Sequence, residues 1–287
     1  MTHPVTLLDL WRSMVFKSSR KKLIASGCSY TDNWWTREHG VRVWPEILAE
    51  KLDMDCINLG QCGRGNEYIF QTIIDEVQKH KNIGLVIPMW SEWNRIDFQR
   101  NQRSPKGYSW NTVRMGTELI KDKLSEFSRI NDDHIRLINQ MENSFYIRNL
   151  FGANICIERA IRFFYLFQEI MTLKKLDYIQ SSAVYPIPLD IIKDDGRGWN
   201  DELFIKTFFN SIYFDEINHK KFVGWPVLSQ LGGDTMDEMI WRLSPDKDIK
   251  DGVGTKYTMS ANDSHPNEAG HTLIAERLYD EYKKIYL

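Results

Sequence analysis

A short apolar run, Leu23-Ile24-Ala25, passes directly into Ser26-Gly27-Cys28-Ser29-Tyr30-Thr31 near the start of the chain. An apolar run that ends in small residues is typical of a buried strand followed by a tight turn. A serine on such a turn is held clear of the sheet, where a base can approach it. Serine is a weak nucleophile at neutral pH, because it needs a base to accept its proton and a third group to orient that base. Ser29 is therefore a candidate nucleophile whose partners lie elsewhere in the chain.

Both partners occur near the other end of the chain, in Asp263-Ser264-His265-Pro266. His265 offers an imidazole that can accept the Ser29 proton, and Asp263 offers a carboxylate that can hold this imidazole. Each residue also has a simpler interpretation. Ser29 and Asp263 are residue types that cap helix N-termini, and His265 fits an exposed surface position.

Short apolar runs alternate with helical patterns between these two stretches. Strands are predicted at 55–59, 84–90 and 177–183, with helices that begin at Trp44 and at Asn66, the predicted N-cap of the second. A long amphipathic helix is predicted before the strand at 177–183, a further helix near 202–212, and a final helix over 266–286. This alternation predicts an α/β fold with a parallel sheet.

Residues 96–150 interrupt the alternation. The stretch 100–111 is polar and is predicted to be a loop, whereas 119–141 is charged and has a helical pattern. We interpret 96–150 as a helical insertion after the strand at 84–90. The chain 1–287 is then a single domain with its core at 20–95 and 150–287, preceded by a short amphipathic, helical lead-in at 1–20.

Composition narrows the classes of partner and location. The net charge of −2 gives no general attraction to nucleic acid or to an anionic membrane. No apolar run approaches the roughly 18 residues of a membrane span, and no signal-peptide core is present. The four cysteines have neither a CxxC pair nor zinc spacing, which fits free thiols in a reducing compartment. A cytoplasmic location is the default, with association with a virion or release by lysis as alternatives; the composition leaves the oligomeric state open.

Two further polar blocks follow predicted strands. One is Asn58-Leu59-Gly60-Gln61-Cys62-Gly63-Arg64-Gly65-Asn66, and the other is Trp90-Ser91-Glu92-Trp93-Asn94-Arg95. Ligands of open α/β sheets bind beyond the carboxyl ends of the strands, so all four blocks are expected at one edge. Their order resembles that of the SGNH, or GDSL-type, hydrolase superfamily. Gly27-Cys28-Ser29 stands where that family has Gly-Asp-Ser, and His265-Pro266 stands where it has Asp-x-x-His-Pro, here with the acid two residues before the histidine.

The resemblance implies a three-layer α/β/α fold around a mainly parallel, flavodoxin-like sheet. It implies a catalytic triad of Ser29, His265 and Asp263, with no metal and no cofactor. It also implies an oxyanion hole made by the backbone N–H groups of Ser29 and Gly63 and the side chain of Asn94. Ser91 is the alternative to Asn94, because the third block here lacks the Gly and Asp of the family's Gly-x-Asn-Asp. Gly60 and Gly63 also fit plain turn positions.

Five further side chains have less specific expectations. Cys28 is expected to be a small buried packing residue. Glu92 and Arg95 are expected to form a solvated surface pair. The Trp34-Trp35 pair is a candidate for lining a sugar or acyl cleft.

The expected function is a serine esterase that acts on small acyl esters, with O-acetyl groups on carbohydrates as the substrate that family analogy suggests. The expected partner is thus a small-molecule or glycan ester. One alternative is a non-catalytic SGNH-like module that binds carbohydrate or has a structural role in a virion. A second alternative is an O-acyltransferase, which would use the same serine and histidine with an alcohol in place of water.

Overall fold

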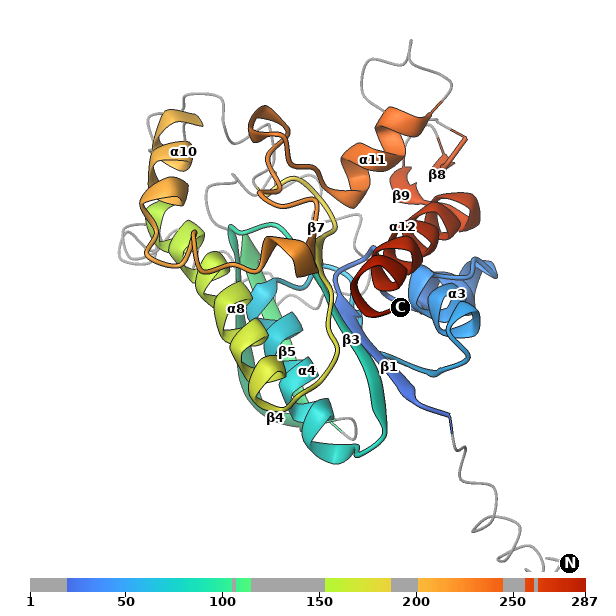
Figure 1. The fold of residues 1–287 in the computed structure, drawn as a ribbon. Helices are drawn as coiled ribbons and strands as arrows, with labels where there is room; N and C mark the ends of the chain where they lie inside the picture. The colour runs from blue at the N-terminus through green and yellow to red at the C-terminus, as the bar shows by residue number, and fades with distance from the viewer. Residues whose placement is uncertain (1–19, 105–106, 115–152, 187–200, 245–255, 261–262) are drawn as a thin grey trace, which may run out of the picture.

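The computed structural model describes residues 20–104, 107–114, 153–186, 201–244, 256–260 and 263–287. A five-stranded sheet forms its centre, with the order β2-β1-β3-β6-β7 and parallel pairing throughout (Figure 1). The strands are β1 (Lys22–Gly27), β2 (Asp55–Asn58), β3 (Ile83–Trp90), β6 (Gln180–Ser182) and β7 (Phe222–Val223). In chain order this is the 2-1-3-4-5 arrangement of flavodoxin-like sheets, as predicted.

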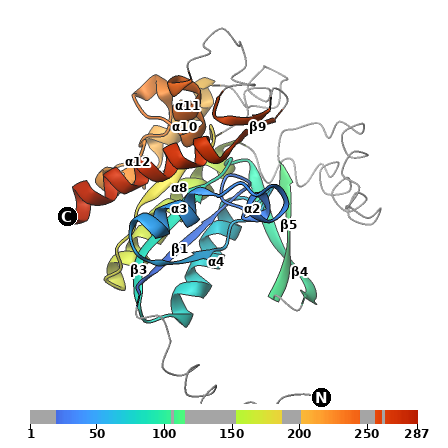
Figure 2. The same cartoon turned by 90° about the vertical axis from the view of Figure 1, so that its right-hand side faces the viewer.

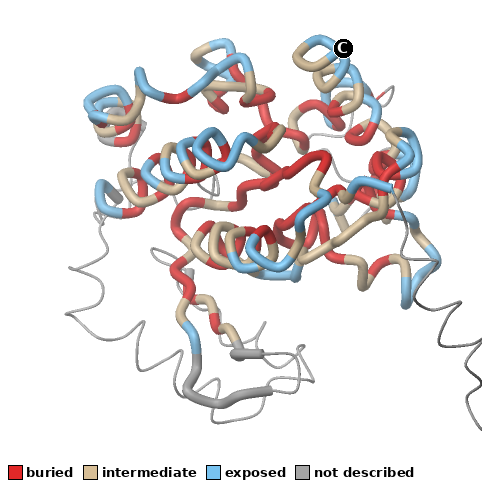
Figure 3. Tube along the Cα trace, turned by 60° about the horizontal axis from the view of Figure 1, so that its bottom comes forward, coloured by how far each residue is buried: buried red, intermediate tan, exposed pale blue. Residues whose placement is uncertain are grey.

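Helices cover both faces of the sheet (Figure 2). Successive side chains of a strand point to opposite faces, so each of β1 and β3 contributes to two cores. Ile24 and Val86 face α4 (Asn66–Lys79) and α8 (Ala153–Leu173). Leu23 and Leu85 face α3 (Trp44–Lys51), α11 (Met236–Leu243) and α12 (Glu268–Tyr286). The predicted three-layer α/β/α architecture is confirmed, and the buried residues gather in the strands and on the inner faces of the helices (Figure 3).

Two helix starts differ from the predictions. The N-cap of α4 is Gly65 rather than Asn66, whose buried side chain instead accepts a hydrogen bond from Ser91 N–H at 2.8 Å. The final helix begins at Glu268 after the N-cap Asn267, whose side chain accepts the N–H of Gly270. Pro266 lies before it in β9 (Asp263–Pro266), which pairs antiparallel with β8 (Thr258–Ser260). The helix near 202–212 is α10 (Asp201–Asn210).

The start of the predicted helical insertion is a β-hairpin instead. β4 (Arg95–Ser104) and β5 (Gly107–Arg114) pair antiparallel, so the expectation of a loop at 100–111 is wrong. The hairpin stands beside α4 (Figure 2). Ile96 and Val113, which are paired in register, are buried, and Phe98 and Trp110 are partly buried against the same core. The helix predicted at 119–141 and the lead-in before residue 20 lie outside the described residues.

Candidate active site

The turn after β1 presents Ser29 at the carboxyl edge of the sheet. The N–H groups of Thr31 and Asp32 both donate to the carbonyl of Cys28, at 2.9 and 3.1 Å, and close the turn tightly. Gly27 allows this closure, because a Cβ at that position would lie 2.1 Å from Thr31 Oγ1. The Cys28 side chain packs in the core as expected, whereas Ser29 points away from it with 6% of its surface exposed.

Ser29, His265 and Asp263 lie in one hydrogen-bonded row. Ser29 Oγ is 2.9 Å from His265 Nε2, and His265 Nδ1 is 2.6 Å from Asp263 Oδ1. The same Oδ1 accepts the backbone N–H of His265 at 3.0 Å. Asp263 and His265 are two residues apart in strand β9, and residues two apart in a strand lie on the same face. The strand therefore holds the Asp263 carboxylate beside His265, just before α12. Offset by one position from the family spacing, Asp263 still contacts the imidazole directly.

Two aromatic rings pack around the imidazole. The ring of Trp35, on α2 (Trp34–His39), lies 5.2 Å from that of His265, and the ring of Tyr30 lies 5.8 Å from it. Trp35 Nε1–H also donates to the carbonyl oxygen of Ser29 at 2.8 Å, in a buried position. A single side chain therefore contacts both the serine backbone and the histidine ring, which fixes their relative placement.

A second carboxylate lies near this group but has a different partner. Asp237, in the first turn of α11, accepts a hydrogen bond from the Tyr30 hydroxyl. Burial raises the pKa of Asp237, and burial together with the Asp237 charge raises the pKa of Tyr30 well above its ordinary value. Asp237 is thus hydrogen-bonded to Tyr30, whereas Asp263 is the acid that contacts the imidazole directly.

The glycine-containing loop after β2 is tied to the Ser29 turn. Gln61 N–H donates to the carbonyl of Gly27 at 3.0 Å, and Cys62 N–H donates to Asp32 Oδ2 at 2.8 Å. Gly63 follows with a φ of 77°, a left-handed conformation that favours glycine. In the described part of the chain, the N–H groups of Ser29 and Gly63 have no hydrogen-bond acceptor. These two donors are thus available to a ligand at this edge.

The block after β3 forms a buried polar cluster. Arg95 pairs with Glu92 at 2.7 Å, and only 7% and 12% of the two side chains are exposed, so the expectation of a solvated surface pair is wrong. Arg95 Nη1 also donates to Ser91 Oγ at 2.9 Å and to the carbonyl of Arg64 at 3.0 Å. The polar composition of 91–95 hides this burial, because the block folds back on itself so that Arg95 contacts Glu92 and Ser91, and the carbonyl of Arg64 adds a distant acceptor. Asn94, in the same block, is completely buried.

Asp97, a residue that the sequence did not single out, supports the glycine-containing loop from the hairpin. Its carboxylate accepts the N–H groups of Gly65 and Tyr68 at 2.9 and 3.0 Å and the Thr112 hydroxyl at 2.6 Å. Asp97 thereby caps the N-terminus of helix α4 from strand β4. Burial raises the pKa of this carboxyl group despite the three donors.

The described ranges contain no cluster of three or more His, Cys, Asp or Glu side chains that could hold a metal ion. No helix within those ranges is long and apolar enough to cross a membrane.

Comparisons with known proteins give likenesses at the level of structure. No family model and no curated protein sequence matches the chain. A lipolytic protein of the G-D-S-L family from Desulfitobacterium hafniense is 13% identical with a TM-score of 0.43, over 91% of this chain and 99% of that chain. The esterase EstA from Pseudoalteromonas sp., in a structure inhibited by monoethylphosphonate, is 12% identical with a TM-score of 0.43, over 92% and 97%. The acetyl xylan esterase AlAXEase is 13% identical with a TM-score of 0.41, over 90% and 98%.

Proposed function

We propose that this protein is a serine esterase in which Ser29 is the nucleophile, His265 the general base and acid, and Asp263 the group that orients and stabilises the histidine. The observation that carries the proposal is the continuous row of contacts at 2.9 Å from Ser29 Oγ to His265 Nε2 and at 2.6 Å from His265 Nδ1 to Asp263. Both distances are within the range in which a proton passes along a hydrogen bond.

The order of steps follows from which nitrogen holds the proton. An ionised Asp263 accepts from Nδ1–H, so Nε2 carries the lone pair that takes the Ser29 proton. Ser29 Oγ then forms a bond to the carbonyl carbon of the ester, and the carbonyl oxygen becomes an oxyanion. As this intermediate collapses, the bond to the alcohol breaks, and His265 gives its proton to the departing oxygen. A water molecule then attacks the acyl group on Ser29 while His265 takes its proton. When this second intermediate collapses, the bond to Ser29 Oγ breaks, His265 returns the proton to Ser29, and the acid is released.

The oxyanion needs donors that point to the carbonyl oxygen before the reaction begins. The N–H groups of Ser29 and Gly63 are suited to this role, because both lie on the linked turns and neither has an acceptor in the described residues. Each donor of this kind lowers the barrier by about 3 kcal/mol. Asn94 is proposed as a third donor from its place in the block that follows β3; because its side chain is completely buried, this role requires substrate binding to open a path to its amide.

Small acyl groups are the proposed substrates, with O-acetyl groups on carbohydrates as the first class to test. Trp35, Tyr30 and the buried Ser29 turn leave the nucleophile with little exposed surface. A compact acyl group is easier to seat there than a long chain, because the rings already occupy the space around the imidazole.

The experiment measures hydrolysis of p-nitrophenyl acetate by the wild type and by Ser29→Ala and His265→Ala. Each substitution is expected to reduce kcat by about 10⁴-fold or more. Ser264→Ala and His219→Ala are matched controls, because both side chains are exposed and hold no position in the row. A fluorophosphonate should label the wild type at Ser29 and leave Ser29→Ala unlabelled. Equal rates in all five proteins would overturn the proposal.

A further inference from the structure

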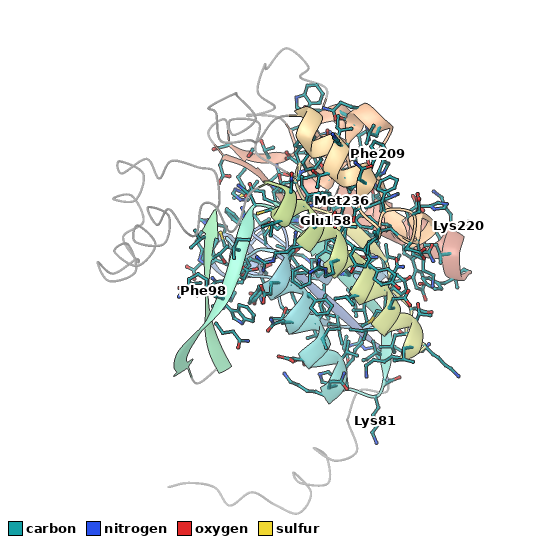
Figure 4. The ribbon with its side chains drawn as sticks, turned by 90° about the vertical axis from the view of Figure 1, so that its left-hand side faces the viewer. Lys81, Phe98, Glu158, Phe209, Lys220 and Met236 are labelled. Carbon is teal, nitrogen blue, oxygen red and sulfur yellow. The ribbon has the colours of Figure 1, made fainter. Side chains whose placement is uncertain are left out.

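A groove of about 860 Å³ lies next to the site, with one end lined by Asp32, three residues after Ser29, and by Gln61 and Arg64 of the glycine-containing loop. Ser29, Gly63 and His265 themselves do not line it. The groove continues away from them between the edge strand β2, helix α4 and the β4–β5 hairpin. Figures 2 and 4 show the hairpin standing beside α4, with Phe98 on the hairpin side of the molecule. The volume lies at the upper end of the range for ligand sites, and far exceeds what a small acyl group fills.

The charged residues along the groove balance one another. Its lining includes three acids and three bases: Asp32, Asp75, Glu76, Arg37, Arg64 and Lys79. Several of them already have partners within the chain, since Glu76 contacts Lys79 and Arg64 Nε donates to Gln61. A nucleic acid or another polyanion would require an excess of bases, which the groove does not have. A fatty acyl chain would require an apolar lining, which it also lacks.

Three aromatic side chains lie at intervals along this polar lining. Trp34 lies at the end next to the Ser29 turn, whereas Tyr68 and Trp110 lie farther along, with their rings 5.5 Å apart and edge-on. Gln61 and Gln99 add amide groups to the lining. Gln61 Oε1 accepts from Arg64 and Gln99 Nε2 donates to Gln71, so within the described residues the Gln61 NH₂ group and the Gln99 oxygen remain for a ligand. The Asn58 amide, by contrast, is bonded to Thr31 and Gly60. Flat apolar faces next to planar polar groups match a ligand that presents C–H faces and hydroxyl edges.

We propose that this groove binds an uncharged oligosaccharide and places an ester on that chain at Ser29. The position of the ester rests on the proposed esterase function, whereas binding of the glycan itself does not. The glycan would be the alcohol portion of the substrate, so it would remain in the groove after the acyl group has been transferred to Ser29.

The test separates binding from hydrolysis. Ser29→Ala, which cannot turn over an ester, is applied to a glycan array that holds uncharged, sulfated and uronic-acid oligosaccharides. The same array is probed with Ser29→Ala/Trp110→Ala and with Ser29→Ala/Trp241→Ala. Trp241 is the matched control, because it is half-exposed on α11 and outside the groove. Titration of the best array ligand, followed by calorimetry, gives Kd for each protein.

We expect uncharged glycans to bind, Trp110→Ala to raise Kd by about tenfold, and Trp241→Ala to leave it unchanged. Binding confined to the acidic glycans, no binding at all, or an equal effect of both tryptophan substitutions would overturn the groove proposal. None of those results would contradict the esterase proposal, which is tested separately by the Ser29-dependent hydrolysis of p-nitrophenyl acetate. Conversely, glycan binding without any such hydrolysis would reject the esterase and retain the groove.

Discussion

The substitution Asp263→Asn would remove the charge of the orienting acid and keep its geometry. Asp263 Oδ1 accepts both the His265 backbone N–H, at 3.0 Å, and His265 Nδ1, at 2.6 Å. A backbone N–H can only donate, so the asparagine has to present its carbonyl oxygen, and not its NH₂ group, at this position. The imidazole then keeps its Nδ1–H tautomer, and Nε2 remains able to take the Ser29 proton.

The expected loss follows from the charge alone. A close ion pair near a protein surface contributes about 4 kcal/mol at an effective dielectric constant of about 20. The Asp263 and His265 side chains are 36% and 32% exposed, so water screens part of that attraction. We therefore expect the variant to lose about 2 kcal/mol of transition-state stabilisation, which is about a thirtyfold decrease in kcat. Asp263→Ala, which also releases the ring, should lose about 10⁴-fold.

The assay is the steady-state hydrolysis of p-nitrophenyl acetate, with kcat measured for the wild type and both variants. An asparagine variant as inactive as the alanine variant would refute the reasoning, because it would show that the tautomer is lost. Wild-type activity in Asp263→Asn would show that the charge has no role. Asp237→Asn is the matched control: it should keep most of kcat, because the Asp237 carboxylate is bonded to Tyr30.

Three further substitutions test the surroundings of the site. Trp35→Phe loses the 2.8 Å bond to the Ser29 carbonyl and should lower the free energy of unfolding by about 1 kcal/mol. Its kcat should fall more than its KM changes, and Trp241→Phe, at a half-exposed position on α11, is its control. Burial lowers the pKa of His271 to about 3. As the pH falls below about 6.5, the unfolded chain protonates this histidine while the folded chain does not. The free energy of unfolding should therefore fall by about 1.4 kcal/mol per pH unit toward pH 3. His271→Leu should flatten that slope in urea unfolding between pH 7 and pH 5, and an unchanged slope would contradict the assignment. Asp97→Ala leaves three buried donors without their acceptor and should cost about 3 kcal/mol in thermal unfolding, whereas a neutral effect would show that water replaces the carboxylate.

The sequence predicts the parts of the fold that are long or strongly patterned. The apolar runs of β1 and β3 and the proline in the first turn of α3 give clear local patterns, and the structure follows them. Strand β7, by contrast, is only Phe222–Val223, which is too short for any periodicity to be visible. The hairpin was missed because its few apolar residues, Ile96, Phe98, Trp110 and Val113, are separated by a polar stretch, and because Asp97 bonds to the N-terminus of α4, a contact that the sequence pattern does not reveal.

The site shows the same division between local and distant information. Ser29 was singled out by its residue type and its position after a predicted strand, and Asp263 and His265 by their residue types and their position before the predicted final helix. Trp35 gives no such indication, because its importance comes from contacts with Ser29 and His265 that only the folded chain creates. The sequence gives no indication of the role of Asp97 either, since its carboxylate accepts hydrogen bonds from amides that lie 29 and 32 positions earlier in the chain.

The row of contacts joins residues 236 positions apart, with the serine on the turn after β1 and the histidine just before α12. A chain emerging from the ribosome therefore holds its nucleophile and the glycine loop long before it holds a base. Under the proposed function, each molecule would become reactive only when β9 docks against the turn that carries Ser29. A chain cut before residue 263 would keep the serine and the glycine-containing loop, lack the base, and be inert toward esters.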